Sequence, residues 1–280
     1  MKIRHSVYSL LAGVALLAAC DSIAERDRLI EVPSVSVTRS VLVEEFSGQY
    51  CTNCPYGAAQ LHQLQQQYGA DTLVVVTIHC GVDEGFGADP AEDDEDFKSL
   101  VTGMGEERYK QVGSPSQPSL LVDRRGGVVI RDDVGSKPEN ASSKWLTAIL
   151  DAFKLPPVLR LGATATCQPA DSTITVDVLA LTEADANARL SVWVTEDHIT
   201  AFQKFSDHYD FAYEHNNILR ASATPLDGDA VTFRGHKTAR FAYRIPVDSR
   251  WNVANLSIVA FVTDNSGVCQ TVRVPVKVRR

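Results

Sequence analysis

The chain has 280 residues, of which 44% are hydrophobic and 22% are charged. This composition is ordinary for a globular protein, and the length predicts about two domains. The formal net charge of -8 argues against nucleic acid as a partner, because phosphate binding needs a basic surface.

The first twenty residues have the pattern of an export signal. Basic Lys2 and Arg4 precede the apolar run Val7–Leu17, which leads into Leu17-Ala-Ala-Cys20 and is too short for a membrane span. This box resembles the cleavage site of bacterial lipoproteins, in which the cysteine is acylated. We therefore expect residues 1–20 to be a lipoprotein signal peptide that ends at lipidated Cys20. A plain secretory signal with a coincidental cysteine is the alternative.

Residues 21–38 are polar and show little periodicity, so they are interpreted as a tether. A multiply acylated Cys20 would hold the protein at a membrane, since one acyl chain alone binds only marginally. The expected location is the cell envelope, lipid-anchored, at the outer membrane. The oligomeric state is not predicted.

Residues 39–154 alternate strand and helix patterns. A predicted strand, Val41–Phe46, leads into Cys51-Thr-Asn-Cys54-Pro55. A helix is expected over Cys54–Tyr68, because apolar residues recur there every three or four positions and Gly69 is placed to end it. The later expected elements are a strand over Thr72–His79, a helix within Phe97–Val112, a strand over Pro118–Asp123, a hairpin partner over Val128–Ile130 and a helix over Ser142–Phe153.

Lys154-Leu-Pro-Pro157 is a stiff break, after which helical patterns nearly disappear. Residues 158–280 predict an antiparallel β-sandwich, because strand-like runs follow one another closely. His198–Asn217 is expected to be irregular; its aromatic residues are interpreted either as a binding surface or as packing against the sandwich. The predicted strands are Leu159–Cys167, Thr173–Leu181, Leu190–Thr195, Thr238–Pro246, Leu256–Thr263 and Val268–Val278.

The Cys51 and Cys54 thiols carry the chemistry that the sequence predicts. Two cysteines at i and i+3 on the first turn of a helix can close a small disulfide, and the helix N-terminus favours a thiolate at Cys51. A fixed structural disulfide and half of a zinc site are the alternatives. Export to an oxidising compartment also allows a second disulfide, and Cys167 with Cys269 is the guessed pair, which leaves Cys80 as the odd thiol.

Residues 39–154 resemble thioredoxin in the order strand, Cys-x-x-Cys helix, strand and proline-led strand. The resemblance implies that Pro118 follows a cis peptide bond and packs against the dithiol. It also implies that Glu45, six residues before Cys51, is a buried proton acceptor. Cys51 is then expected to be partly exposed and Cys54 more buried. The expected fold is an α/β thioredoxin-like domain (39–154) followed by an all-β antiparallel sandwich domain (158–280).

The whole chain resembles the outer membrane protein 28 related lipoproteins of Bacteroidetes. Glu44-Glu45-Phe46-Ser47-Gly48 before the dithiol and Glu214–Arg220 in the second half carry this resemblance. The resulting hypothesis is thiol–disulfide exchange on exported proteins, with protein thiols or disulfides as substrates and with no cofactor or metal. The alternative is a non-catalytic binding or adhesin lipoprotein that uses the thioredoxin-like fold as a scaffold.

Overall fold

The computed structural model describes residues 39–94, 96–131, 142–168 and 172–279. The first half alternates strands and helices: β1 (Val41–Ser47), α2 (Cys54–Tyr68), β2 (Leu73–His79), η2 (Pro90–Glu92), α3 (Gly103–Gln111), β3 (Ser119–Val122), β4 (Val129–Ile130) and α4 (Ser143–Phe153). The second half is almost wholly strands: β5 (Leu159–Gln168), β6 (Thr173–Thr182), β7 (Ala186–Glu196), β8 (Ile199–Lys204), β9 (Tyr209–His215), β10 (Ile218–Ser222), β11 (Asp229–Phe233), β12 (Thr238–Pro246), η3 (Val253–Asn255), β13 (Leu256–Asp264) and β14 (Gly267–Val278).

The elements around the dithiol form for local reasons. Every residue of β1 and β2 is buried, as expected for apolar strands covered on both faces. Helix α2 has Pro55 in its first turn, where the missing N–H costs nothing. The helix ends at Gly69, whose φ of 88° suits a residue without a Cβ atom. No helix in the described residues is long and apolar enough to cross a membrane.

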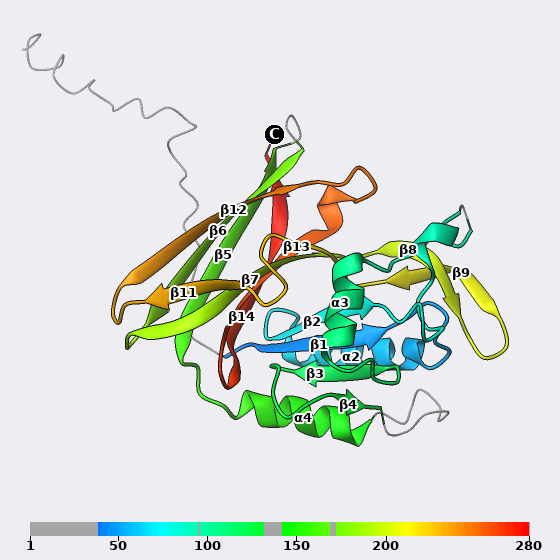
Figure 1. Cartoon of the computed structure of the whole chain (residues 1–280), viewed down its shortest axis with the longest axis horizontal. Coiled ribbons are helices and arrows are strands. Elements are labelled where there is room, and N and C mark those ends of the chain that lie inside the picture. The colour runs from blue at the N-terminus through cyan, green and yellow to red at the C-terminus, as the bar shows by residue number, and fades with distance from the viewer. Residues whose placement is uncertain (1–38, 95, 132–141, 169–171, 280) are drawn as a thin grey trace, which may run out of the picture. The chain divides into compact units, whose positions relative to one another are not determined.

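The expectation of an α/β thioredoxin-like domain followed by a separate sandwich is wrong. All the described strands except β8 and β9 join one mixed twelve-stranded sheet that spans both halves, in the order β12-β6-β5-β14-β13-β7-β10-β2-β1-β3-β4, with β11 added on β7 (Figure 1). The junction is a parallel pairing of β10 with β2, where Ile218 lies opposite Thr77. The all-antiparallel expectation also fails, because β14 pairs with β5 in parallel.

The two halves also share a hydrophobic core. Phe46 and Ile78 of the first half are buried in the same cluster as Trp193, Val259 and Phe261 of the second half. A separate core lies on the other face of β1 and β2, under α2 and α4. The described residues accordingly group as one compact unit, and the sequence could not reveal this, because each half contains enough apolar residues to suggest a core of its own.

Strand β14 changes partner along its length. Residues Gly267–Pro275 pair with β13, whereas Val276–Val278 pair with β5. Leu161 and Val176 on one layer and Val192 and Ile258 on the other therefore meet in the largest core cluster. The second half is a folded-over β structure whose layers are connected through β14.

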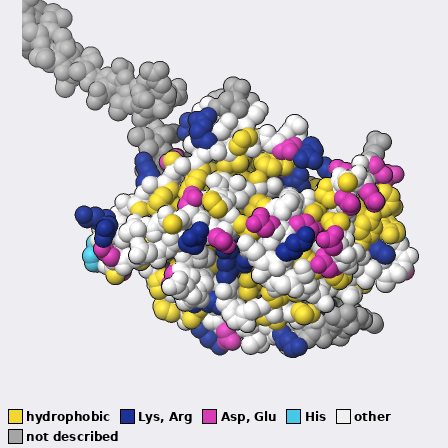
Figure 2. Space-filling model, viewed as in Figure 1, with side chains coloured by type: hydrophobic (Ala, Val, Ile, Leu, Met, Phe, Trp, Pro, Cys, Tyr) yellow, Lys and Arg dark blue, Asp and Glu magenta, His cyan; other side chains and the backbone are white. Residues whose placement is uncertain are grey.

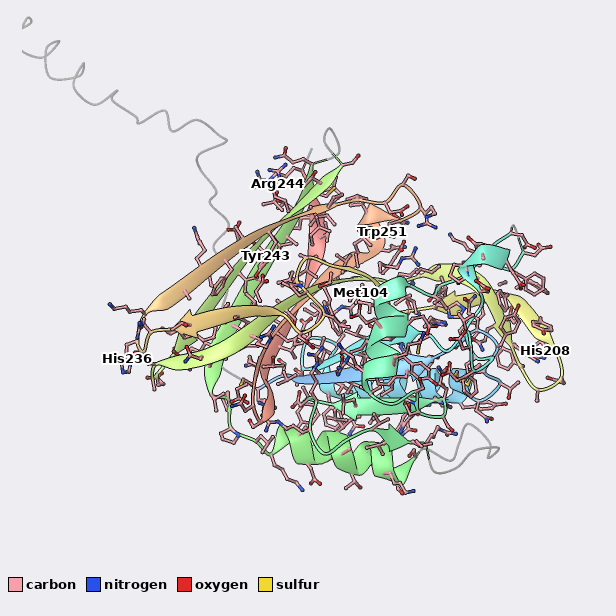
Figure 3. The ribbon with its side chains drawn as sticks, viewed as in Figure 1. Met104, His208, His236, Tyr243, Arg244 and Trp251 are labelled. Carbon is pink, nitrogen blue, oxygen red and sulfur yellow. A yellow bond between two sulfur atoms is a disulfide. The ribbon has the colours of Figure 1, made fainter. Side chains whose placement is uncertain are left out.

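Residues His198–Asn217, expected to be irregular, contain a complete two-stranded hairpin. Strands β8 and β9 pair in an antiparallel manner outside the large sheet. Figure 3 places His208 at the turn of this hairpin, on the opposite side of the view from His236. The β8–β9 hairpin lies beside the loop that carries the dithiol, and this contact positions the candidate site.

Glu44, whose side chain is fully buried, connects α3 to β1 through a largely buried ion network. Its carboxylate accepts hydrogen bonds from Arg108 at 2.8 and 3.0 Å and from Arg124 at 3.2 Å. Burial alone would raise the pKa of Glu44, but the two guanidinium groups outweigh it and the pKa is lowered. The carboxylate therefore stays ionised within the core.

Candidate functional site

The dithiol lies between the end of β1 and the start of α2. Cys51 and Cys54 form a disulfide with their Cα atoms 5.4 Å apart, so the predicted pairing is confirmed. The amide of Cys54 donates to the carbonyl oxygen of Cys51 at 3.2 Å, which begins the helix. The disulfide therefore sits at the positive end of the α2 dipole.

Pro118 lies against the first turn of α2. The Gln117–Pro118 peptide bond is cis, as the resemblance implied. A Cβ atom added to Gly57 would be 3.1 Å from Pro118 Cβ and 2.9 Å from the Trp145 ring, so only glycine fits at this crossing. The Gln117 side chain reaches to 4.0 Å from Cys54 Sγ.

The loop that carries Cys51 is fixed by two glutamines. The Gln203 side chain, from β8, donates to the carbonyl oxygens of Gln49 and Cys51, both at 3.1 Å. The Gln49 side chain donates to the carbonyl oxygen of Lys98 and accepts from the amide of Leu100. These bonds tie the β8–β9 hairpin and the backbone at Lys98 and Leu100 to the disulfide loop.

Cys51 is more covered than expected. It is 4% exposed and Cys54 is 1% exposed, so the expectation of a partly exposed Cys51 is wrong. The local pattern gave no sign of this burial, because the loop also contacts a segment about 150 residues further along the chain. Local opening is therefore expected to aid the access of reagents to Cys51.

An aromatic cluster, comprising Tyr50, Phe97, Phe202, Tyr209 and Phe211, packs beside the disulfide loop. Tyr50 contacts Phe202 with ring centroids 5.1 Å apart, and Phe97 contacts Phe202 at 4.9 Å. Its outer members are exposed, Phe211 by 48% and Tyr209 by 39%. Figure 2 shows hydrophobic side chains at this end of the hairpin, next to the carboxylates of the loop around η2.

A cavity of about 350 Å³ opens on the other side of the disulfide, and both Cys54 and Glu45 line it. Glu45 is 1% exposed, and its Oε2 accepts from Thr77 Oγ1 at 2.7 Å. Burial raises the pKa of Glu45 to about 7, and the Thr77 hydrogen bond opposes this only in part. The Glu45 carboxyl therefore exchanges a proton near neutral pH.

Two buried histidines line the same cavity. The His79 and His215 rings meet edge to face with centroids 5.1 Å apart. Burial lowers the pKa of His215 to about 4 and that of His79 well below its usual range. Both rings are therefore neutral at pH 7. Tyr213 completes this polar lining, and burial together with the Glu45 charge raises its pKa to about 12.

Cys80 is buried and free, and Gln117 connects it to the site. The Gln117 amide donates to the Cys80 carbonyl oxygen at 3.2 Å, while its oxygen faces Cys54. Burial, with a contribution from the Glu106 charge, raises the pKa of the Cys80 thiol well above its usual range. Cys80 is therefore a protonated thiol with low reactivity in this fold.

The other cysteines of the sequence analysis lie away from this site. The guessed Cys167–Cys269 disulfide is not formed, because Cys269 is a free thiol that donates to the carbonyl oxygen of Gly267. Cys20, the expected lipidation site, lies outside the described residues. Within the described residues, no three His, Cys, Asp or Glu side chains are grouped so that they could hold a metal ion.

The structure brings together Cys51, Cys54, Glu45 and Pro118, and it adds residues that sequence reasoning missed. Gln203, Tyr213 and His215 come from β8 and β9, about 150 residues beyond the dithiol. The one signal for them in the sequence is the Glu214–Arg220 stretch. It carries part of the family resemblance, but the resemblance assigns no role to its residues. The sequence offers two interpretations of His79-Cys80, a Cys–His nucleophile or the end of a strand, and it favours the strand end.

Comparison with known proteins decides the family. The model of the outer membrane protein Omp28 family matches residues 106–280. The chain belongs to the Omp28 family. This confirms the family resemblance found in the sequence and places the protein at the outer membrane of the cell envelope.

The fold of this Omp28-family chain is also similar to that of solved structures. HBP35 of Porphyromonas gingivalis has a TM-score of 0.62 at 15% sequence identity, covering 87% of this chain and 77% of that one. A domain of the outer membrane lipoprotein Omp28 from Porphyromonas gingivalis has 20% identity and a TM-score of 0.32, covering 44% of this chain and 91% of that one. The likeness to HBP35 extends across both halves of the chain and concerns the fold alone. No curated protein matches.

Proposed function

We propose that this Omp28-family protein carries out thiol–disulfide exchange on exported proteins through Cys51 and Cys54. The observation that carries the proposal is the placement of Glu45. Its buried carboxyl lines the same cavity as Cys54 and has a pKa of about 7. A group that exchanges a proton near neutral pH beside a disulfide is suited to general acid–base catalysis of exchange.

The exchange balances as two displacements. A client thiolate attacks Cys51 Sγ, the Cys51–Cys54 bond breaks, and the Cys54 thiolate takes the proton of Glu45. A second client thiolate then attacks the client sulfur of the mixed disulfide and releases Cys51. The client is oxidised to a disulfide and the protein is reduced to a dithiol; the reverse sequence reduces a client disulfide.

Pro118 and the helix terminus have supporting roles in this proposal. The α2 dipole stabilises a thiolate at the N-terminal turn. Pro118 packs against that turn, where it shapes the surface on which a client backbone would dock. Because Cys51 is 4% exposed, attack requires the disulfide loop to open locally, and the Gln203 bond links that opening to the β8–β9 hairpin.

The test is capture of a mixed disulfide by a Cys54→Ala variant. With Cys54 absent, a client that has reacted with Cys51 stays attached, and non-reducing electrophoresis followed by mass spectrometry identifies it. A Cys51→Ala variant is the matched control and should trap nothing. The proposal fails if no adduct forms and if Cys51, in the reduced protein, titrates like an ordinary cysteine.

A second candidate function is non-catalytic binding, and the coverage of Cys51 favours it. A disulfide closed off by the β8–β9 hairpin can be purely structural, while exposed Tyr209 and Phe211 offer a contact surface. A Cys51→Ser, Cys54→Ser double variant separates the two functions. Client binding that survives in this variant, with no exchange in the parent, supports the binding function.

A further inference from the structure

The cavity beside Cys54 contains two buried polar atoms without a hydrogen-bond partner. Glu45 Oε1 and His79 Nδ1 are both orphaned, although each residue is at least 97% buried. Leaving such atoms unsatisfied is costly, so a donor is expected to reach them. In the neutral tautomer with the proton on Nε2, His79 Nδ1 is an acceptor like the carboxylate oxygen.

Apolar side chains form part of the cavity wall. Pro55, Ala58, Leu61, Val75 and Ile218 line it, together with the uncharged polar residues Ser47, Thr77, Gln203, Asn216 and Asn217. The mouth lies where exposed residues of α2 meet exposed Glu214. A volume of about 350 Å³ is sufficient for one extended side chain. An occupant that fills this space would have an apolar stem and a polar end that donates hydrogen bonds.

The charges around the cavity favour a positive end. Glu45 and Glu214 supply two carboxyl groups, and no Lys or Arg belongs to the described residues that line the cavity. The charge of Arg220 acts on His79, but Arg220 pairs with Glu196 at 3.3 Å. The remaining titratable side chains in the lining are His62, His79, His215 and Tyr213, since Cys54 is held in the disulfide.

We propose that this cavity binds a primary ammonium or guanidinium group on an unbranched alkyl stem, as presented by a lysine or arginine side chain of a client protein. The stem lies along the apolar part of the wall, and the charged end donates to Glu45 Oε1 and His79 Nδ1. The binding itself does not depend on the proposed exchange function; only the assignment of the bound side chain to a client protein rests on that function. The site would select clients that have a basic residue close to the reacting cysteine.

Calorimetric titration of the oxidised full-length protein tests the binding directly. The probes are two blocked tripeptides with a central lysine or a central norleucine, and free n-butylamine. The lysine peptide should bind roughly tenfold more tightly than the norleucine peptide, as expected for a charge-assisted hydrogen bond. Equal affinities would overturn the proposal and assign water to the orphaned atoms. Tighter binding of n-butylamine than of the lysine peptide would overturn the assignment to a client side chain.

Two variants localise the interaction. Glu45→Gln should reduce the preference for lysine to nearly one, while Glu214→Gln at the mouth should change it by less than about twofold. A preference that survives in Glu45→Gln contradicts the proposal. If Glu45→Gln does not fold, the pH profile of the parent protein decides: affinity for the lysine peptide should fall as the pH drops through about 7, where Glu45 becomes protonated. A flat profile would contradict the proposal.

The outcome is separable from that of the exchange function. Lysine binding without mixed-disulfide capture leaves this inference standing and removes the proposed function. Capture without any preference for lysine supports the proposed function and overturns this inference. If both proposals are correct, the two can be linked through the rate of mixed-disulfide formation with cysteine peptides. In the parent protein, a peptide with a lysine next to its cysteine should react faster than one with a norleucine there. In Glu45→Gln, the two peptides should react at equal rates.

Discussion

The Gln203 side-chain amide donates a 3.1 Å hydrogen bond to the carbonyl oxygen of Cys51, across 152 positions of sequence. The same amide nitrogen also lies within hydrogen-bond distance of the carbonyl oxygens of Gln49 and Lys204. One side chain of the β8–β9 hairpin thus bonds to the backbone of the disulfide loop. Access to Cys51 is therefore linked to the stability of this contact.

Replacing Gln203 by Leu should loosen the hairpin and accelerate chemical reduction of Cys51–Cys54. The carbonyl oxygens of Gln49 and Cys51 keep the backbone donors Lys204 and Cys54 but lose their side-chain bond to the hairpin, at a cost of about 0.5–1.5 kcal/mol, so local opening becomes up to about tenfold more frequent. The rate of reduction by a small dithiol measures the effect. His208→Ala, at the exposed turn of the hairpin, is the control and should react like the parent. An unchanged rate in Gln203→Leu would show that the hairpin does not limit access.

Replacing Glu45 by Gln should change how stability depends on pH. The native pKa of about 7 lies above the ordinary value of 4.5, so the native state binds the proton more tightly than the unfolded chain. The parent should therefore lose stability as the pH rises between these two values, by about 3 kcal/mol in total. Glu45→Gln lacks this loss. Urea unfolding at several pH values measures it, and parallel profiles for the two proteins would contradict the buried neutral carboxyl.

Replacing the adjacent Glu44 by Gln should destabilise the fold by about 3–5 kcal/mol, because Arg108 and Arg124 would remain as buried charges without a counter-ion. The pKa of Glu44 is lowered, so its contribution is present above the unfolded pKa and is lost as the pH falls through the native pKa. Denaturant unfolding near pH 7 measures the loss. Glu107→Gln, on the exposed face of α3, should be nearly neutral.

Replacing Gly57 by Ala should destabilise the protein by about 1–3 kcal/mol, since the new Cβ would lie 2.9 Å from the Trp145 ring and 3.1 Å from Pro118. Gly103, the first residue of α3, has nothing within 4 Å of such an atom. Gly103→Ala is therefore the matched control and should be neutral or slightly stabilising. Thermal unfolding compares them, and equal midpoints would contradict a tight contact between α2 and Pro118.

Local pattern predicted the elements that hold the dithiol. Val41–Phe46 is an unbroken run of strand-forming residues, and Gly69 ends the following helix, so β1 and α2 lie close to their expected bounds. Glu45 and Pro118 could be named as candidates, because the thioredoxin resemblance implies a buried acid and a cis proline at their positions; their roles in exchange stay predictions. These are short-range relationships that a single sequence displays.

The joining of the two halves was not predictable in the same way. Strand β10 meets β2 at the single register pair Ile218–Thr77, and a backbone contact of this kind leaves no side-chain pattern. Strand β9 was missed because most of its residues are exposed or half-buried, so they show no apolar alternation. His215 and Gln203 reach the dithiol only through this arrangement.

Thr77 holds two groups at once: its hydroxyl donates to Glu45 and its amide donates to the carbonyl oxygen of Asn217 at 2.8 Å. A change in the charge of Glu45 is therefore felt directly at the peptide group where the two halves meet. The amide resonances of Thr77 and of the residue after Asn217 become intrinsic spectroscopic reporters of the site. Titrating them follows the proton of Glu45 without any label on the cysteines.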